Sequence, residues 1–156
     1  LEAYDAANLG KNLIVGSMVV FLNGEPDKSQ YRQFKILSSK GDPDYLKEII
    51  KRRFKHQEWL YPEVILVDGG KPQISAAFQV LKEKNLAKQI PILGLAKKEE
   101  KIFIPKVIKE QITSWKIIKY KNSSLVHQLL QYARDEAHRF AQRYYKKVHQ
   151  KITFEV

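Results

Sequence analysis

The residues best suited to chemistry in this sequence are two aspartates and a histidine, Asp5, Asp68 and His138. Asp5 ends a short opening segment and is followed by two small alanines. Asp68 directly follows the apolar run 64–67 and precedes two glycines, which let a backbone or a ligand approach closely. Two carboxylates and an imidazole can hold Mg²⁺ or Mn²⁺, and such an ion polarises a phosphodiester and activates a bound water. These residue types therefore suggest metal-assisted phosphodiester hydrolysis.

Each of the three residues also has an ordinary structural interpretation. Asp5 is a residue type that often lies in a turn or caps a helix. Asp68 is costly to bury unless a cation, an arginine or backbone donors compensate it, and it could instead cap a helix that starts at Pro72. His138 falls on the flank of an apolar helical stripe, beside Arg134, where a half-exposed histidine commonly just packs its ring. The local sequence leaves both interpretations open.

The glycines after Asp68 do not form a nucleotide-triphosphate site. Gly69, Gly70 and Lys71 superficially resemble a phosphate-binding loop, but the G-x-x-x-x-G-K-[ST] spacing is absent.

The charge of the chain is strongly basic and unevenly distributed. Lys and Arg number 28 and Asp and Glu 17, so the net charge is +11. Residues 1–78 contribute +1 (11 basic, 10 acidic) and residues 79–156 contribute +10 (17 basic, 7 acidic). Such a basic half attracts a polyanion, and we expect nucleic acid in preference to solubility alone, for which a net charge of about 2–8 already suffices. Two basic clusters stand out, at Lys51, Arg52, Arg53 and Lys55 and at Arg139, Arg143, Lys146, Lys147 and Lys151.

The composition excludes several classes of protein. With no cysteine, the chain has no disulfide, thiolate metal site or cysteine nucleophile, and a reducing, cytoplasmic compartment is expected. No apolar run approaches the roughly 18 residues of a membrane span, and the first residues do not resemble a signal peptide. The length of 156 residues suits one domain. Because the chain lacks an initiator Met, we expect it to be a piece of something longer.

The segments that must position the candidate residues alternate between strand and helix patterns. Strands are expected at Leu1–Asp5, Val15–Leu22, Tyr31–Ile36, Val64–Val67 and Ile90–Leu95, an edge strand at Glu100–Pro105, and helices at Tyr45–Phe54, Pro72–Lys84 and Ser124–His149. Residues 106–121 are lysine-rich and predicted to be irregular, or a further hairpin around Trp115–Ile118. The last helix is expected to bury a stripe of Val126, Leu130, Ala133, Ala137, Phe140, Ala141 and Tyr144. This order predicts an α/β fold, in which sites form at the carboxyl ends of strands such as 64–67.

Four blocks of the sequence resemble one known family, the C-terminal endonuclease domain of UvrC. They are Glu2–Gly10 with Val15–Phe21 and Tyr31–Phe34; Gly41–Tyr45 leading to Lys51–Phe54; Leu66–Gln73 followed by Gly94–Lys97; and Leu129–Ala141. The resemblance covers essentially the whole chain. Its most specific parts are Val67–Lys71 (VDGGK) and Arg134–Phe140 (RDEAHRF).

The resemblance implies an RNase H-like fold over residues 1–156, with three antiparallel strands, further parallel strands and flanking helices. It implies a metal-dependent DNA endonuclease that cuts on the 5′ side of a lesion in nucleotide excision repair, with Mg²⁺ or Mn²⁺ as cofactor. Damaged double-stranded DNA is the implied substrate, and UvrB is the implied partner of a full-length protein.

The resemblance also implies roles for individual residues. Asp5, Asp68 and His138 correspond to the metal-binding and catalytic set, and a further family acid falls at Asp44, with Asp42 as the competing choice. The expected DNA-contacting residues are Lys71, Arg134, Arg139, Arg143, Lys146 and Lys147.

The sequence departs from the family at three places. After Asp5 the family usually has Ile-Ser-His, whereas this chain has Ala6-Ala7-Asn8. Pro72 stands where a glycine is usual, and residues 106–124 keep little of the family's proline-bearing loop. Two alternative functions therefore remain: a nucleic-acid-binding module that has lost catalysis, and a different RNase H-like nuclease.

Overall fold

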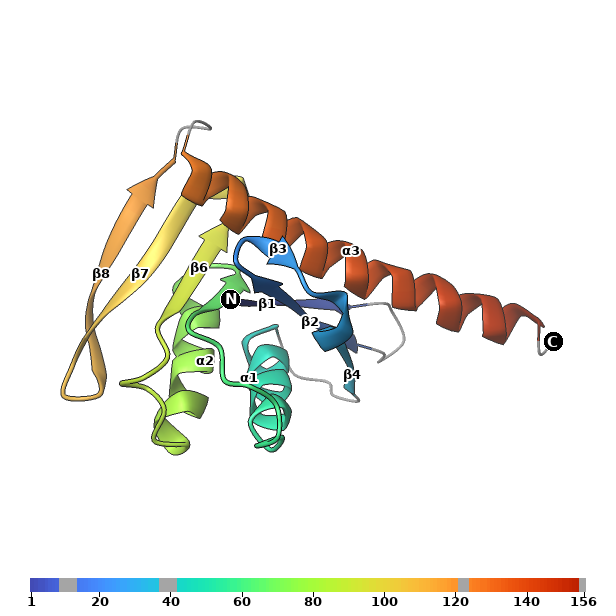
Figure 1. The fold of residues 1–156 in the computed structure, drawn as a ribbon, viewed down its shortest axis with the longest axis horizontal. Coiled ribbons are helices and arrows are strands. Elements are labelled where there is room, and N and C mark those ends of the chain that lie inside the picture. The colour runs from blue at the N-terminus through green and yellow to red at the C-terminus, as the bar shows by residue number, and fades with distance from the viewer. Residues whose placement is uncertain (9–13, 37–41, 121–123, 155–156) are drawn as a thin grey trace.

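The computed structural model describes residues 1–8, 14–36, 42–120 and 124–154 and contains one mixed sheet with helices on both faces (Figure 1). The strands are β1 (Glu2–Asn8), β2 (Ile14–Leu22), β3 (Glu25–Pro26), β4 (Arg32–Ile36), β5 (Ile65–Asp68), β6 (Ile92–Ala96), β7 (Lys101–Ile108) and β8 (Gln111–Lys119). The helices are α1 (Asp42–Arg53), α2 (Lys71–Glu83) and α3 (Leu125–Phe154), with short 3₁₀ turns at Lys28–Gln30 and Lys97–Glu99. The strand order is β3-β2-β1-β5-β6-β7-β8, and β4 also pairs with β2.

Three antiparallel strands, β1, β2 and β4, form one side of the sheet, as the sequence predicts. β2 and β4 pair from Ile14–Ile36 to Met18–Arg32, and the turn of Asn23 and Gly24, both with positive φ, joins β2 to β3. One boundary in this region was predicted incorrectly. β1 does not end at Asp5 but continues to Asn8, because β2 pairs with it along its whole length. Asp5 therefore lies inside a strand and not at its end.

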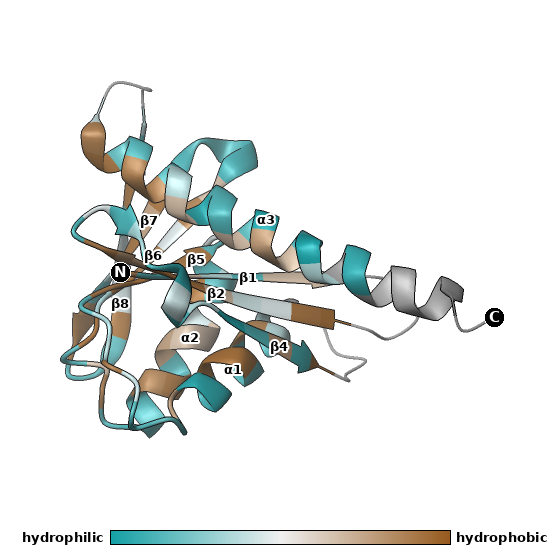
Figure 2. Cartoon of the chain, turned by 45° about the vertical axis from the view of Figure 1, so that its right-hand side comes forward, coloured by the Kyte–Doolittle hydropathy of each residue, from teal (hydrophilic) through white to brown (hydrophobic). Residues whose placement is uncertain are grey.

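The centre of the sheet is parallel. β5 lies between β1 and β6 and runs parallel to both, and Asp68 is its last residue. The apolar run 64–67 is explained by this position, since a central parallel strand is covered on both faces. α1 and α2 pack on one face around residues such as Ile49 and Ile74, and α3 packs on the other through Ala133 and Ala137. Figure 2 shows the amphipathic pattern of α3.

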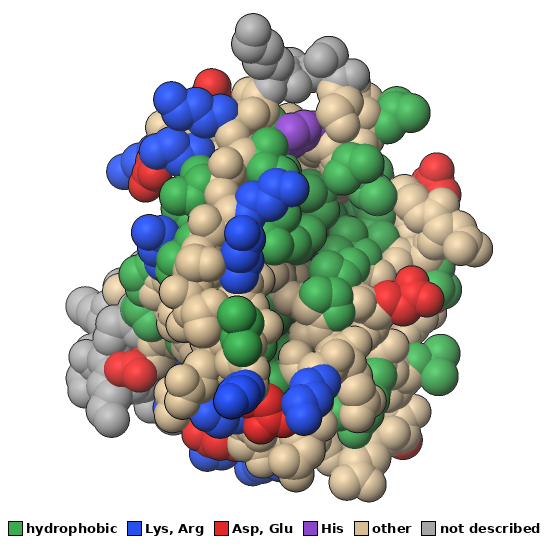
Figure 3. Space-filling model, turned by 90° about the vertical axis from the view of Figure 1, so that its left-hand side faces the viewer, with side chains coloured by type: hydrophobic (Ala, Val, Ile, Leu, Met, Phe, Trp, Pro, Cys, Tyr) green, Lys and Arg blue, Asp and Glu red, His purple; other side chains and the backbone are tan. Residues whose placement is uncertain are grey.

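The region 101–119 differs most from the sequence prediction. Of the two alternatives for residues 106–121, the hairpin is present and the irregular segment is not: β7 and β8 form a long hairpin that turns at Lys109 and Glu110, both with positive φ, and Trp115–Ile118 lies within β8. β8, not β7, is the edge of the sheet. β7 pairs with β6 only through Lys101–Phe103, so the rest of the hairpin extends beyond β6. Figure 3 shows this side of the molecule, where Lys and Arg side chains lie beside hydrophobic ones.

The helices agree with the expected ones in position. α3 is longer than expected, and its C-terminal half extends past the sheet (Figure 1). Of the predicted apolar stripe, Leu130, Ala133, Ala137 and Ala141 are buried, whereas Val126 is exposed because it lies in the first turn of α3. None of the described helices is long and apolar enough to cross a membrane.

A buried ion pair joins the sheet to the end of α1. The Arg53 guanidinium, which has no exposed surface, donates to the Glu2 carboxylate at 2.8–2.9 Å and to the Leu60 carbonyl at 2.6 Å. The Tyr4 hydroxyl donates to the same carboxylate. Burial and the neighbouring Glu2 charge hold the pKa of Tyr4 well above its usual range, so Tyr4 remains a neutral donor. Arg53 of the first basic cluster is therefore structural.

Replacing Arg53 with methionine should lower the free energy of unfolding by about 3–5 kcal/mol, because it leaves the Glu2 carboxylate buried without its counter-charge. Urea unfolding followed by circular dichroism measures the loss. Arg52, the adjacent residue, provides the matched control. Its ion pair with Glu48 is exposed, so Arg52→Met should cost only about 0.2–1 kcal/mol. Equal losses for the two variants would contradict the structural role of Arg53.

Candidate active site

The parallel pairing of β1 with β5 brings two carboxylates together. Tyr4 pairs with Val67, so the next residue of each strand, Asp5 and Asp68, lie side by side where β5 ends. Both residues line a cavity of about 110 Å³, together with Gln73 of α2. The sequence predicts Asp5 at this edge because the first strand is expected to end there. Asp5 instead lies within β1, and its carboxylate borders the cavity because the neighbouring strand β5 ends at Asp68.

The environment of Asp68 disfavours its negative charge. Burial raises the pKa of the Asp68 carboxyl, and the nearby Asp5 carboxylate raises it further. Arg134 and His138 act in the opposite direction without cancelling the rise. A pair of carboxylates in such a half-buried place gains from any cation that binds between them. The interpretation of Asp68 as a helix cap is not supported, because the residue that caps α2 is Gly70.

His138 reaches the site from α3 and contacts Asp5. Its Nδ1 lies 2.8 Å from Asp5 Oδ2, and its Nε2 lies 2.9 Å from the side-chain nitrogen of Gln142, one turn further along the helix. Both contacts are satisfied when Nδ1–H donates to Asp5 and Nε2 accepts from the Gln142 amide. The side chain of Asp5 is only 8% exposed, whereas that of His138 is 52% exposed. The ring thus connects the buried carboxylate to solvent.

Two strands hold the part of α3 that carries His138. The hydroxyl of Ser17, a fully buried residue of β2, donates to the Ala137 carbonyl at 2.7 Å. The side-chain amide of Gln33, in β4, donates to the Phe140 carbonyl at 3.2 Å. Ser17 is also the residue that pairs with Asp5 across β1 and β2. Hydrogen bonds from neighbouring strands therefore flank His138 on the helix and fix it over β1.

The carboxylates of Asp5 and Asp68 are suited to bind a divalent cation. Carboxylate oxygens are the ligands that Mg²⁺ and Mn²⁺ prefer, and a bound cation would offset both the burial and the Asp5 charge that raise the pKa of Asp68. Asp5 engages Nδ1 of His138, so only the Nε2 of this ring could contact a cation directly. Within the described part of the chain, no three acidic, histidine or cysteine residues are grouped closely enough to hold a metal ion.

The further acid is not joined to this cavity. Asp44 is exposed in the first turn of α1 and is not among the residues that line the cavity. The side chain of Asp42, the competing choice, lies outside the described residues.

The residues expected to contact DNA fall into two groups. In the first group, Arg143, Lys146 and Lys147 are exposed on α3. Lys71, at the start of α2, belongs to the same group and lies over the ring of Trp115, with its nitrogen 5.8 Å from the ring centre. The other two arginines are engaged. Arg134 is 3% exposed and bonds Asp135, leaving its Nη1 buried without a partner among the described residues. Arg139 forms two hydrogen bonds with Glu136, which hold the pKa of that carboxyl below its usual range.

Sequence reasoning did not identify Gln73, Ser17 or Gln142 as part of this site. Gln73 lies five residues after Asp68 and Gln142 four residues after His138, so helical spacing offered a signal for Gln142 alone.

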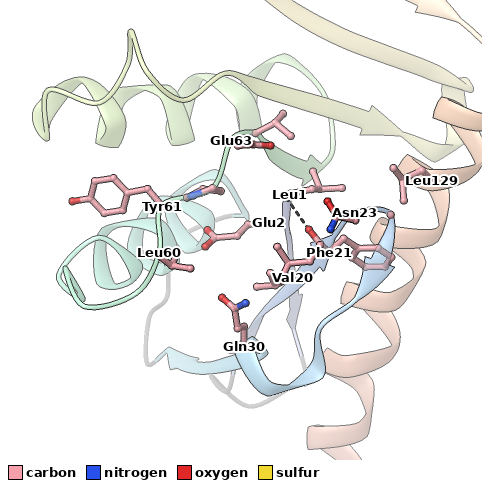
Figure 4. A pocket seen from close by; sticks show the side chains of 14 residues that line it. Leu1, Glu2, Val20, Phe21, Asn23, Gln30, Leu60, Tyr61, Glu63 and Leu129 are labelled. Atoms are coloured by element: carbon pink, nitrogen blue, oxygen red, sulfur yellow. Dashed lines mark hydrogen bonds between the residues drawn. The ribbon is translucent and has the colours of Figure 1, made fainter.

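A larger cavity, of about 420 Å³, lies away from this site, around Leu1, Phe21 and Tyr61 (Figure 4). There the N-terminal amine donates to the Phe21 carbonyl at 3.1 Å. Its lining contains none of the candidate catalytic residues.

The fold has a clear likeness among solved structures. It resembles endonuclease V of Ciona intestinalis, solved in complex with inosine-containing DNA, with a TM-score of 0.57 over 94% of this chain and 86% of that chain. The two sequences are only 13% identical, so the likeness concerns the fold alone. It confirms the RNase H-like, mixed α/β class predicted from the sequence.

Comparisons of sequence identify the family. The chain is 42% identical to UvrABC system protein C of Dictyoglomus thermophilum and 38% identical to that of Methanosphaera stadtmanae, in both cases over 97% of its length. It spans about a quarter of those relatives, 24% and 26%. The family model described as the UvrC RNase H endonuclease domain matches residues 1–142, a range that contains Asp5, Asp68 and His138. By this match and these identities, the chain belongs to the UvrC RNase H endonuclease domain family.

Proposed function

We propose that this chain is a divalent-metal-dependent DNA endonuclease that makes the 5′-side incision of nucleotide excision repair. The observation that carries the proposal is the meeting of Asp5, Asp68 and His138 at the end of β5, in a member of this family. The relatives are named as parts of the UvrABC system. Damaged double-stranded DNA as substrate, UvrB as partner of a longer protein and a cytoplasmic location belong to the same proposal.

The two carboxylates have the role of holding the ion. Asp5 and Asp68 would bind one Mg²⁺ or Mn²⁺, which supplies charge neutralisation at the phosphate and a lowered pKa for a bound water. Asp5 has a second task, because one of its oxygens also accepts from His138. This hydrogen bond orients the imidazole toward the phosphate site and stabilises the positive charge that the ring gains when it takes up a proton.

His138 has the role of proton acceptor. Its Nε2 carries a lone pair, which the Gln142 amide covers in the structure and which becomes available when that exposed side chain moves. In the hydrolysis, a water oxygen forms a bond to phosphorus and its proton passes to Nε2. The bond from phosphorus to one sugar oxygen breaks, and that oxygen takes a proton from solvent. The products are a phosphate monoester end and a hydroxyl end.

The DNA backbone is proposed to lie along α3. Arg143, Lys146 and Lys147 are exposed on the half of the helix that extends past the sheet, and Lys71 lies at the start of α2. Lysine and arginine contacts with phosphates give affinity without sequence preference, as cutting beside a lesion requires. Arg134 and Arg139 contribute in another way, by fixing Asp135 and Glu136 beside the site.

Replacing Asp68 with asparagine should lower the rate of DNA nicking by about 100-fold or more, because the ion supplies several kcal/mol of charge stabilisation. Nicking of an end-labelled duplex that carries a bulky lesion, with Mn²⁺, measures the rate. The same variant should unfold at an equal or higher temperature without metal, because it removes a charge that the fold disfavours at neutral pH. The control is Asp27→Asn, an exposed carboxylate before the Lys28–Gln30 turn. Full activity in Asp68→Asn would exclude the proposed metal site.

The affinity for Mn²⁺ should fall as the pH is lowered, beginning at a higher pH than for an ordinary aspartate. The raised pKa of Asp68 means that protons compete with the ion at a higher pH than they would at an ordinary aspartate. Calorimetry at a series of pH values measures the affinity, and buffers of different ionisation enthalpy report the protons released. In Asp68→Asn the remaining affinity should depend less on pH. A pH-independent affinity in the unsubstituted protein would contradict the assignment of Asp68.

The variant His138→Gln separates the two possible roles of the histidine. As a proton acceptor, His138 should be dispensable for Mn²⁺ binding, and its loss should lower the nicking rate by about 10²–10⁴-fold. Calorimetry and the nicking assay are carried out on the same preparation. A loss of Mn²⁺ binding equal to that in Asp5→Asn would instead make His138 a ligand of the ion.

A further inference from the structure

We infer that Gln73 is a further catalytic residue. Its side-chain N–H donates to a non-bridging phosphate oxygen of the DNA strand that would bind at the ion of Asp5 and Asp68. The inference rests on the proposed nuclease function and adds a residue to it. Gln73 is the third residue of α2, and it lines the same 110 Å³ cavity as the two carboxylates.

The orientation of the Gln73 amide is fixed by a backbone donor. The Gly70 N–H donates to Gln73 Oε1 at 3.1 Å. A backbone N–H can only donate, so the oxygen of the amide must face it and the nitrogen must face away. Within the described residues, Gln73 Nε2 has no hydrogen-bond partner of its own. An oriented amide donor is therefore left free beside the two carboxylates.

Gly69 is the reason that the side chain can take this position. Its φ is +136°, and a Cβ atom placed there would lie 2.6–2.7 Å from Cδ, Cγ and Oε1 of Gln73. The side chain of Gln73 folds back over Gly69 and occupies the space that any other residue would fill. The two glycines after Asp68 thus serve one arrangement: Gly69 makes room for the amide and Gly70 fixes its oxygen.

The free N–H of the Gln73 amide is suited to bind an anionic oxygen and not a cation. An amide N–H is a donor and cannot coordinate a cation, so Gln73 does not add a ligand to the ion. A phosphodiester held against a metal ion presents an anionic non-bridging oxygen, which carries more negative charge as the water attacks. A fixed donor aimed at that oxygen stabilises the transition state more than the ground state.

A role in capping α2 is the competing explanation, and one substitution separates the two. Glutamate at position 73 still offers an oxygen to the Gly70 N–H, and glutamate is a good residue at this position of a helix. It removes the N–H donor. With saturating Mn²⁺, which neutralises the added carboxylate, a capping role predicts that Gln73→Glu keeps its kcat, whereas the inferred role predicts a loss of kcat.

The test compares Gln73→Glu with Gln79→Glu, the same change on the exposed side of α2, where Gln79 accepts from Lys47. Gln73→Glu should unfold at an equal or lower temperature in metal-free buffer, because it adds a third carboxylate to the cavity, and it should bind Mn²⁺ at least as tightly. Its kcat for nicking should fall by about 10²-fold, as on removal of one donor to a developing oxyanion. Gln79→Glu should keep all three properties. An unchanged kcat in Gln73→Glu would overturn the inference.

A second measurement does not depend on cleavage. In a ¹⁵N-labelled protein with Mg²⁺, the side-chain amide signals of Gln73 should shift when a thymidine dinucleotide with one phosphodiester is added, and those of Gln79 should not. No shift of the Gln73 signals at saturation would also overturn the inference. Failure of the proposed function looks different: Asp68→Asn would then nick and bind Mn²⁺ like the unsubstituted protein, whatever happens at Gln73.

Discussion

The arrangement of this molecule depends on one pairing, that of β1 with β5. The two strands run parallel, and their register places Asp5 beside Asp68 where β5 ends. The fold brings two like charges together in a half-buried place, which costs stability unless other groups compensate. Much of the surrounding structure can be understood as that compensation: Arg134 and His138 lower the cost at Asp68, and Asp5 bonds the histidine. Under the proposed function, a cation bound between the two carboxylates would offset this cost.

The histidine needs a different kind of support, because it comes from a helix that only packs on the sheet. Ser17 and Gln33 reach from two strands to main-chain carbonyls on either side of His138. Tyr31 adds a hydrogen bond to Glu136 at 3.1 Å and a ring contact with Phe140. The antiparallel strands β2 and β4 thus do more than complete the sheet. They hold α3 at the height and rotation that place the imidazole over Asp5.

Much of this could be predicted from the sequence, and the reason differs between elements. Asp68 was identified because an acid after a continuous apolar run marks the end of a buried strand, and α2 because Pro72 marks its first turn. The family resemblance selected Asp5 and His138, for which the local sequence alone favoured a turn aspartate and a packed histidine. Their contact joins residues 133 positions apart, and no local pattern carries such information.

Other features were missed for identifiable physical reasons. The hairpin of β7 and β8 could not be distinguished from an irregular segment, because β8 is an edge strand, whose alternation of polar and apolar residues is weak when one side is solvent. Arg53 and Arg134 looked like surface cations because charge is visible in a sequence and burial is not. Both are buried against carboxylates, Glu2 and Asp135. The role of Gln73 depends on the φ of Gly69, which composition alone does not show.

The late position of α3 has a consequence for the order in which the molecule is made. Ribosomes release a chain from its N-terminus, so both carboxylates emerge and can pair in their sheet before the histidine has been synthesised. Until α3 follows, Ala3, Val19 and Leu66 on one face of the sheet have no cover. An interrupted chain would therefore carry the two carboxylates without their proton acceptor. Under the proposed mechanism, this site can cut DNA only when synthesis of the domain is almost complete.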